Sequence, residues 1–523
     1  MTSGDDGWWN VTVDAEDGDE YLFVVEAAGE RWERIDPRGI EVTNSVGRSI
    51  VRAAQWEHPA FTARSLREWV IYELHPGTFG GHLDGVVDHL DELVELGVNA
   101  IELMPVAEFA GDQSWGYNPA LPFAVESSYG GPEAMHRLVD ACHGRGLAVI
   151  VDVVYNHLGP SDLSLWRFDG WHEGDGGGAY FYNDWRAETP WGATRPDYNE
   201  PEVRRFLIDN ARLWLGRYRV DGLRLDSTVN IRNAHGHGGP DGDLAEGWSF
   251  LQELTDTVHA EFPSAVLFAE DLQRDDRVTT ATGDGGLGFD AQWDAGFVHP
   301  IRAALSAERD EDRDLDAVIT ALTSIEGYRR VVYTESHDEV ANGSTRVPAE
   351  IDNDAPGSPH AIRRSAIGAV LVMAAPGIPM LFQGQEWADE DWFDDASPLD
   401  WTRRVERSGL VLLWGDLIRL RTGQDCRAPG LRSDSIECWQ PSPGVLAVRR
   451  GDPGSDESVV VFNLSAVDRE HVDVGLDSAW ACVFSTDYSG YHPSGRDSWL
   501  SVIEGGSALA AYSAQIFSRR TAQ

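Results

Sequence analysis

An α/β fold built on a (β/α)₈ barrel is predicted by three features of the sequence. From about Trp69 onward, short unbroken apolar runs alternate with segments of helical spacing, as in parallel strands that are buried on both faces. Eight such runs occur, which is the number that closes a barrel. The length of 523 residues also fits one large domain with smaller satellites. The predicted strands are Val70–Leu74, Ala100–Met104, Ala148–Val154, Gly222–Leu225, Val266–Ala269, Ala291–Trp293, Val331–Thr334 and Ile378–Phe382.

The barrel is expected to occupy residues 63–424, between two β domains. Residues 1–62 alternate apolar and polar side chains in short runs, which indicates a small and truncated amino-terminal β domain. The connection after the third strand, about 156–201, is long and rich in Gly, Trp and Tyr, and so predicts an inserted loop subdomain. Alternating runs after residue 425 predict a carboxy-terminal β domain over 425–523.

Charge and composition exclude several functions. The chain has 42 basic and 87 acidic residues, a net charge of −45, which argues against nucleic-acid or anionic-membrane partners. All 42 basic residues are arginine, so no lysine amine is available as a nucleophile or for a Schiff base. GC-rich codon usage and a salt-adapted surface both explain the missing lysine. Neither explanation concerns the reaction.

The four cysteines are spaced too far apart to indicate a metal site or a disulfide framework. The amino terminus lacks the charged and apolar regions of a signal peptide, and no apolar run is long enough to span a membrane. A cytoplasmic location is therefore expected. The sequence leaves the oligomeric state open.

Polar residues follow four of the predicted strands at their carboxyl ends, where barrel enzymes place their catalytic groups. A single Asp or His at a strand end is usually a turn or capping residue. Four strands that all end in this way favour a catalytic site instead. The four endings are Asp152-Val-Val-Tyr-Asn-His157, Gly222-Leu-Arg-Leu-Asp226, Ala269-Glu270 and Glu335-Ser-His-Asp338.

These motifs, in this order, resemble the α-amylase family of glycoside hydrolases and transglycosylases, and the resemblance extends over roughly residues 69–401. The resemblance implies that Asp226 is the nucleophile, Glu270 the general acid and base, and Asp338 the carboxylate that stabilises the transition state. A retaining enzyme of this kind needs its two reacting carboxyls about 5–5.5 Å apart. Arg224 lies two residues before Asp226, hence on the same face of its strand, where it favours the ionised nucleophile.

Further roles follow from the same resemblance. Asp152, His157, Arg224 and His337 are expected to contact the sugar, and Tyr117 to stack under its ring. No organic cofactor is expected. Asn156 matches a position that ligates calcium in many members of the family, although its amide is equally suited to hold the long loop by hydrogen bonds.

Within the family the motifs divide between two groups. Residues 72–79, 101–109 and 189–193 look like maltooligosyltrehalose trehalohydrolases, whereas 336–340, 384–386 and 398–401 look like glycogen branching enzymes. Many α-amylases carry a Lys-His pair after the nucleophile, but this chain has Val229-Asn230, so acceptor specificity cannot be transferred from them.

The sequence therefore predicts a retaining glycoside hydrolase acting on α-1,4-glucans or maltooligosaccharides, with trehalose-capped oligosaccharides as one candidate substrate. A branching-type transglycosylase, which would use the same carboxylates, is the alternative. A glucan-binding protein without catalysis is a third reading, and the presence of all three acidic residues argues against it.

Overall fold

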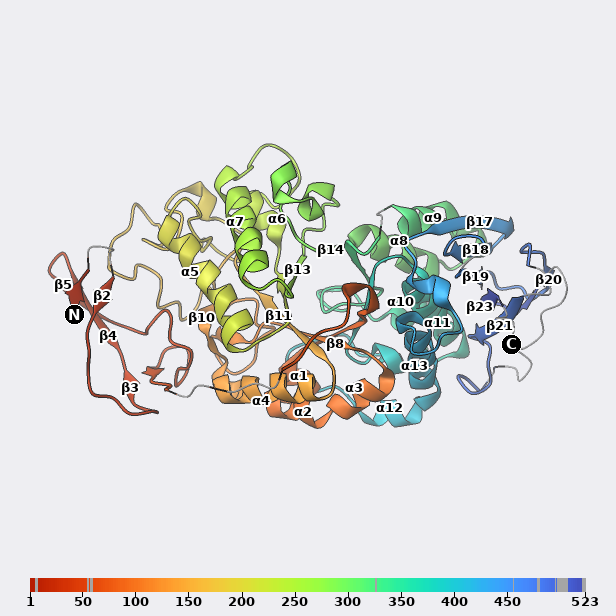
Figure 1. Ribbon diagram of the computed structural model, residues 1–523, viewed down its shortest axis with the longest axis horizontal. Helices are drawn as coiled ribbons and strands as arrows, with labels where there is room; N and C mark the ends of the chain where they lie inside the picture. The colour runs from red at the N-terminus through yellow and green to blue at the C-terminus, as the bar shows by residue number, and fades with distance from the viewer. Residues whose placement is uncertain are drawn as a thin grey trace.

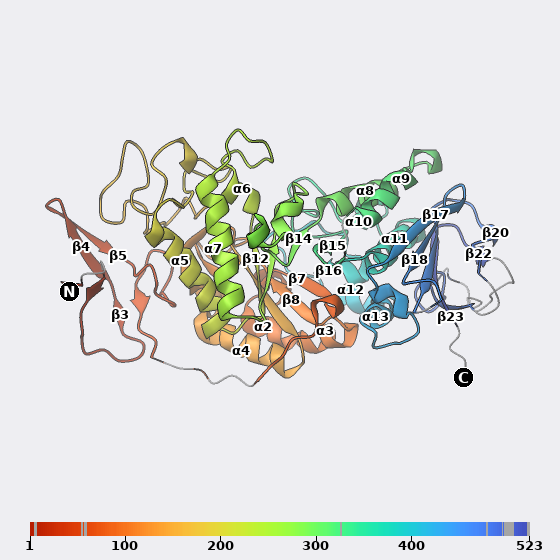
Figure 2. The ribbon, with the colours of Figure 1, turned by 45° about the horizontal axis from the view of Figure 1, so that its top comes forward.

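The computed structural model describes residues 1–4, 8–53, 56, 60–324, 327–454, 456–476, 480–493, 495 and 507–519. The molecule is elongated, with small amino-terminal hairpins at one end, a barrel in the middle and an antiparallel sheet at the other end (Figure 1). Turning the molecule brings the upper helices forward and shows the barrel strands between the two β regions (Figure 2).

Eight parallel strands close the barrel, in the order β11-β12-β13-β14-β15-β16-β7-β8. All eight predicted strands are present, which confirms the predicted fold class. Their ends differ by one or two residues: the seventh strand, for example, stops before Thr334. The strands are β7 (Ile71–Leu74), β8 (Ala100–Leu103), β11 (Ala148–Val153), β12 (Gly222–Leu225), β13 (Val266–Ala269), β14 (Ala291–Trp293), β15 (Arg330–Val332) and β16 (Ile378–Phe382).

Helices follow most of these strands. Local sequence sets their limits: Ser358 caps α11 by accepting a hydrogen bond from the Ala361 amide, and Gly97 ends α3 with a φ of 100°. Among the described residues, only 3₁₀ turns at Asp276–Thr279 and Thr282–Asp284 connect β13 to β14. The helices are α1 (Pro76–Phe79), α2 (Leu83–Asp88), α3 (Leu90–Leu96), α4 (Gly131–Gly144), α5 (Pro201–Arg212), α6 (Thr228–Arg232), α7 (Ala245–Glu261), α8 (Ala295–Ser306), α9 (Leu315–Thr323), α10 (Val347–Ile351), α11 (Pro359–Ala374), α12 (Thr402–Glu406) and α13 (Ser408–Thr422).

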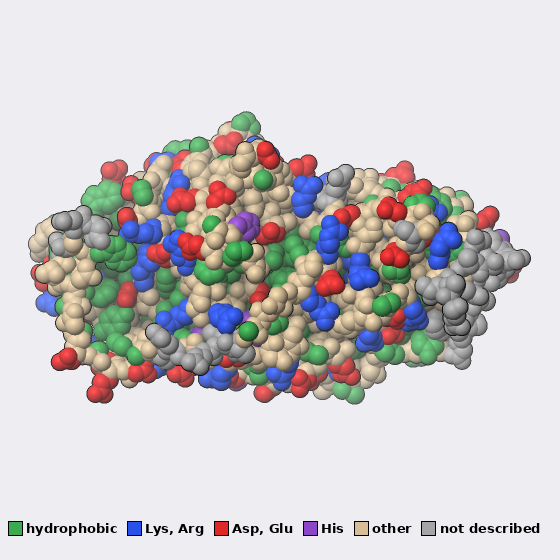
Figure 3. All heavy atoms as spheres, viewed as in Figure 1, with side chains coloured by type: hydrophobic (Ala, Val, Ile, Leu, Met, Phe, Trp, Pro, Cys, Tyr) green, Lys and Arg blue, Asp and Glu red, His purple; other side chains and the backbone are tan. Residues whose placement is uncertain are grey.

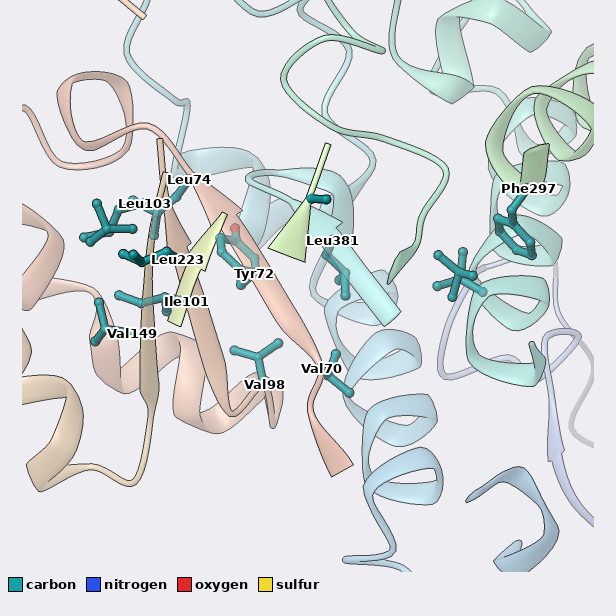
Figure 4. Close-up of a cluster of buried hydrophobic side chains, with 14 of the residues drawn as sticks. Val70, Tyr72, Leu74, Val98, Ile101, Leu103, Val149, Leu223, Phe297 and Leu381 are labelled. Carbon is teal, nitrogen blue, oxygen red and sulfur yellow. The ribbon is translucent and has the colours of Figure 1, made fainter. Parts of the chain in front are cut away.

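Alternate residues of the barrel strands point in opposite directions, so the strands separate two cores. Tyr72, Ile101 and Leu223 belong to the large cluster between strands and helices, which also includes Phe297 of α8 (Figure 4). Residues of the other parity form a second cluster inside the barrel. Its members include Ile71, Ala100, Ala148, Ile150, Phe268, Ala291, Val331, Ile378 and Met380.

Two of the connections that follow barrel strands are longer and more structured than a simple loop. The one after β8 carries an antiparallel pair, β9 (Ala107–Phe109) with β10 (Pro119–Val125), which the sequence pattern did not predict. The one after β11 runs to Pro201 with a single 3₁₀ turn, Trp185–Ala187. Within that loop, buried Arg195 donates to the carbonyls of Glu188 at 2.7 Å and Ala234 at 2.9 Å. Arg195 thus ties the loop to the segment after β12.

The amino-terminal part forms three two-stranded pairs in the described residues, β1-β2, β3-β6 and β4-β5. The strands are β1 (Thr2–Ser3), β2 (Trp9–Asn10), β3 (Glu20–Tyr21), β4 (Phe23–Ala27), β5 (Glu30–Arg34) and β6 (Ser49–Ile50). The four cysteines are all free. No helix in the described part of the chain combines the length and apolarity needed to cross a membrane.

The carboxy-terminal sheet has the order β17-β18-β19-β23-β21 and is antiparallel throughout. One face, including Leu446 and Val460, joins the main core beside the barrel. The opposite face, including Val459 and Phe517, packs with residues of the β20-β22 pair. The strands are β17 (Ile436–Ser442), β18 (Val445–Arg450), β19 (Ser458–Asn463), β20 (Arg469–Val472), β21 (Trp480–Ser485), β22 (Ser507–Leu509) and β23 (Ser513–Arg519).

Candidate active site

A layer of charged side chains lies above the apolar interior of the barrel, toward the carboxyl ends of the strands. The strand register pairs Glu73 with Glu102, and Asp152 with Arg224. These residues have the parity of the inner cluster, so their side chains face the barrel axis. Asp226 and Glu270 follow β12 and β13 with the same parity.

Arg224 is the centre of this layer, and its side chain is fully buried. Its two terminal nitrogens contact three carboxylates: Nη1 lies 2.5 Å from Asp152 and 3.1 Å from Asp226, and Nη2 lies 2.8 Å from Glu270. The guanidinium also lies 4.4 Å from the centre of the Trp293 ring. One cation therefore joins three of the predicted site residues, and an aromatic face supports it.

Asp226 accepts hydrogen bonds through both carboxylate oxygens. Arg224 donates to Oδ1, and the Asn156 amide donates to Oδ2 at 2.7 Å. The same amide nitrogen reaches the Asp226 carbonyl at 3.1 Å. These donors fix the rotamer of the carboxylate.

The surroundings of Asn156 do not fit a calcium site. Its Nδ2 serves Asp226, and its Oδ1 is hydrogen-bonded to Nδ1 of His157. Calcium takes six to eight oxygen ligands. In the described ranges, no group of three or more His, Cys, Asp or Glu side chains is arranged to hold a metal ion. No step of the reaction below is routed through a metal.

Glu270 has the properties of a proton donor. Its Oε2 accepts a hydrogen bond from the Ser227 amide at 2.8 Å and forms an ion pair with Arg224, also at 2.8 Å. Burial is the main cause that raises its pKa to about 8; Arg224 opposes this rise, while Asp226 and Asp338 add to it. Burial likewise raises the pKa of Asp152 to about 7, against the effect of Arg224. Glu270 is therefore protonated at neutral pH.

Asp338 is the most exposed of the predicted catalytic residues, with 49% of its side chain accessible. Its Oδ2 lies 3.6 Å from Nε2 of His337, which is itself buried. Nδ1 of His337 faces Glu73. The charge of Asp338 contributes to the raised pKa of Glu270.

The expected sugar-contacting residues gather around the same centre. The Tyr117 hydroxyl donates to Asp152 at 2.6 Å, and the Tyr117 ring stacks on His337 with 4.9 Å between ring centres. His157 stacks on Trp191 at 4.5 Å, and its Nε2 is buried without a protein partner in the described part of the chain. Burial lowers the pKa of His157 to about 4, so its ring is neutral.

Two features of the site were not predicted. Glu73 contacts His337, and Trp191 covers His157. A sequence signal existed for Glu73, because a charged residue inside a strand buried on both faces needs a buried partner. The position of Trp191 depends on the folded loop, so no local pattern could have revealed it.

Fold and site together define a barrel enzyme that works with buried carboxylates, the class of glycoside hydrolases and transglycosylases. Residues 30–170 match the model of the α-amylase catalytic domain. The chain is 32% identical to a malto-oligosyltrehalose trehalohydrolase of Arthrobacter ramosus over 86% of this chain and 87% of that one. It is 29% identical to a 1,4-α-glucan branching enzyme of Corynebacterium efficiens over 94% of this chain and 71% of that one. The chain belongs to the α-amylase family.

Solved structures agree on the fold. A pullulanase type I from Bacillus subtilis in complex with maltose superposes with a TM-score of 0.77, covering 100% of this chain and 80% of that one, at 22% identity. A putative α-amylase from Salmonella typhimurium gives 0.76, covering 99% and 94% of the two chains, also at 22% identity. At these identities the likeness concerns the architecture alone.

Proposed function

We propose that this chain is a retaining glycoside hydrolase that acts on α-1,4-glucans or maltooligosaccharides, with Asp226, Glu270 and Asp338 as its catalytic residues. The observation that carries the proposal is the shared guanidinium of Arg224, which contacts Asp226 through one terminal nitrogen and Glu270 through the other. A nucleophile and a proton donor are thereby held side by side.

In the first step Glu270 gives its proton to the glycosidic oxygen, and that oxygen leaves with the electrons of the bond. Asp226 attacks the anomeric carbon and forms a covalent glycosyl-enzyme. In the second step Glu270, now ionised, takes a proton from water, whose oxygen displaces Asp226. Asp338 stabilises the positive charge that develops at the sugar ring in both steps.

The unequal environments of the two carboxyls support this division of roles. Asp226 accepts a hydrogen bond through each of its two oxygens, so both ends of the carboxylate are fixed for attack. In Glu270 only Oε2 contacts Arg224 and the Ser227 amide. The other oxygen, Oε1, is left to carry the proton. Two neighbouring carboxyls in unequal environments are the usual arrangement for nucleophile and acid.

The relatives support the substrate class. Relatives named as trehalohydrolases reach 33% identity and relatives named as branching enzymes reach 32%, so identity alone does not separate the two groups. Oligosaccharides that end in trehalose are a candidate substrate. The alternative, a branching-type transglycosylase, is favoured by the motif at residues 336–340 and uses the same carboxylates.

Product analysis separates these possibilities. The protein is incubated separately with amylose, maltooligosaccharides and maltooligosyltrehalose, and the products are identified by chromatography and linkage analysis. Shortened α-1,4 chains support the hydrolase, free trehalose supports the trehalohydrolase substrate, and new α-1,6 linkages support the branching alternative. Absence of any product from all three would contradict the proposed function.

Stereochemistry tests the mechanism separately. Proton NMR of the first product, recorded before mutarotation, is expected to show the α-anomer, because two displacements restore the starting configuration. A β-anomer appearing first would rule out the double displacement. The corresponding geometric expectation is a separation of about 5–5.5 Å between the carboxyls of Asp226 and Glu270.

A further inference from the structure

The buried ring of His337 lies between two carboxylates of different strands. Nδ1 is hydrogen-bonded to Oε1 of Glu73 at 2.5 Å, and Nε2 lies 3.6 Å from Oδ2 of Asp338. Oε2 of Glu73 also accepts the backbone N–H of His337 at 3.1 Å. Glu73 therefore fixes both the ring and the backbone that presents it, although it stands one layer deeper in the barrel.

We propose that Glu73 is a positioning residue that holds His337 as an imidazolium, with its Nε2–H directed at Asp338 and the sugar. Nδ1 is hydrogen-bonded to Glu73 and Nε2 lies within ion-pair distance of Asp338, and two flanking carboxylates favour the protonated ring. The inference rests on the proposed function, because it gives the imidazolium a task in glycoside cleavage.

Other charged groups near the ring come from four strands or their ends. Burial opposes the charge on His337, but Asp338 and Glu73 outweigh it and raise the pKa to about 9; Arg224 acts in the opposite sense. The Tyr117 hydroxyl lies 3.4 Å from Nδ1 and is hydrogen-bonded to Asp152. His75 and Glu102 also lie near the ring, because the charge of His337 lowers the pKa of each of them.

Glu102 shows that Glu73 is special among the buried acids. It faces Glu73 across the β7-β8 register and is equally buried, but neither of its oxygens has a hydrogen-bond partner among the described residues. Burial and Glu73 raise its pKa far above the usual range. Glu102 thus makes no hydrogen bond among the described residues, whereas Glu73 holds His337 through both its ring and its backbone.

The imidazolium has a consequence for the reaction. Asp338 must remain ionised beside two other carboxyls while positive charge develops at the sugar, and an adjacent cation favours that state. Losing the proton should therefore reduce turnover more than binding.

The test compares Glu73→Gln with Glu102→Gln, which removes the neighbouring buried carboxyl. Glu73→Gln is expected to lower kcat by about 10–100-fold with KM changed less than about threefold. In that variant the pKa of His337, read by ¹⁵N NMR, should fall by about one unit or more, because the ring loses the carboxylate bonded to Nδ1. Glu102→Gln should change kcat and this pKa far less, and Glu73→Asp should restore the pKa.

A purely structural role for Glu73 would lower activity or stability without lowering the pKa of His337, and this outcome would overturn the proposal. The measurement on the wild-type protein needs no substrate. Histidine-labelled wild-type protein is titrated by ¹⁵N NMR, with the His337 signal assigned through its absence in His337→Gln. Both ring nitrogens should show protonated shifts at pH 7; a neutral ring would refute the inference even if the enzyme acts on a different glycan.

Discussion

At the scale of single residues, the site is governed by an excess of buried acid. Arg224 contributes one positive charge against Asp152, Asp226 and Glu270, so the three carboxyls cannot all be ionised without a large desolvation cost. Protonation reduces this cost, because burial raises the pKa of Glu270 to about 8 and that of Asp152 to about 7. A general acid is thus a direct result of charge imbalance.

The strand-end motifs were sufficient to find most of this site. Asp226 and Glu270 could be predicted because their position is set by strand ends, which a sequence shows as the last residue of an apolar run. Asn156 was recognised as a site residue, but its hydrogen bond to Asp226 could not be foreseen. That contact joins the ends of β11 and β12, and only the closed barrel specifies it.

Replacing the nucleophile gives the sharpest test at this scale. Asp226→Asn keeps the volume and the hydrogen bond to Arg224 but cannot form the glycosyl-enzyme. We expect kcat to fall by more than about a thousandfold, roughly 4 kcal/mol in barrier height, with an unchanged melting temperature. Asp221→Asn, at the opposite end of the same strand, is the control and should retain turnover. Activity of Asp226→Asn within about tenfold of wild type would disprove the assignment.

Glu270 also links catalysis to stability. Its folded-state pKa of about 8 lies above the usual value of 4.5 for a glutamate, so its neutral form stabilises the protein below pH 4.5 and this contribution is lost as pH rises toward 8. Glutamine does not titrate and should avoid the loss. Glu270→Gln should therefore be inactive yet gain on the order of a few kcal/mol relative to wild type between pH 5 and pH 8. Melting curves at the two pH values measure this gain, and an equal difference at both would contradict the assignment.

At the scale of elements, the barrel strands were predictable because each is buried on both faces and reads as an apolar run. The β9-β10 pair was missed, since Pro119 and Pro122 interrupt the second strand and obscure its pattern. The loop after β11 was recognised by its length and composition alone. Its conformation depends on buried polar contacts such as those of Arg195, which no local periodicity encodes.

Arg195 provides a test of that loop. Its guanidinium is fully buried and donates to backbone carbonyls of Glu188, Asn230, Asn233 and Ala234. Arg195→Ala would leave several buried carbonyls without donors, so residues 156–201 should open locally and KM should rise. Hydrogen exchange and limited proteolysis report the opening. Arg186 lies in the same loop, and its ion pairs with Asp184 and with Glu246 of α7 are more exposed to solvent. Arg186→Ala should therefore have a much smaller effect.

At the scale of the whole molecule, the charge is spread rather than concentrated. Acidic and basic side chains are interspersed over the face seen in Figure 3, so arginines often lie beside carboxylates. The 87 acidic residues nonetheless outnumber the 42 arginines by 45. This excess opposes compaction through long-range repulsion, and it is independent of the catalytic site.

Salt should therefore stabilise the protein. The melting temperature is expected to rise with NaCl from low to molar concentration, because counterions screen the repulsion over a Debye length that falls from about 30 Å at 0.01 M to about 3 Å at 1 M. The same titration near the sequence pI of about 4.5 provides the control, since the net charge and hence the salt effect should become small there. A flat or falling curve at pH 7 would show that repulsion does not limit stability, and codon usage would then be the better account of the missing lysines.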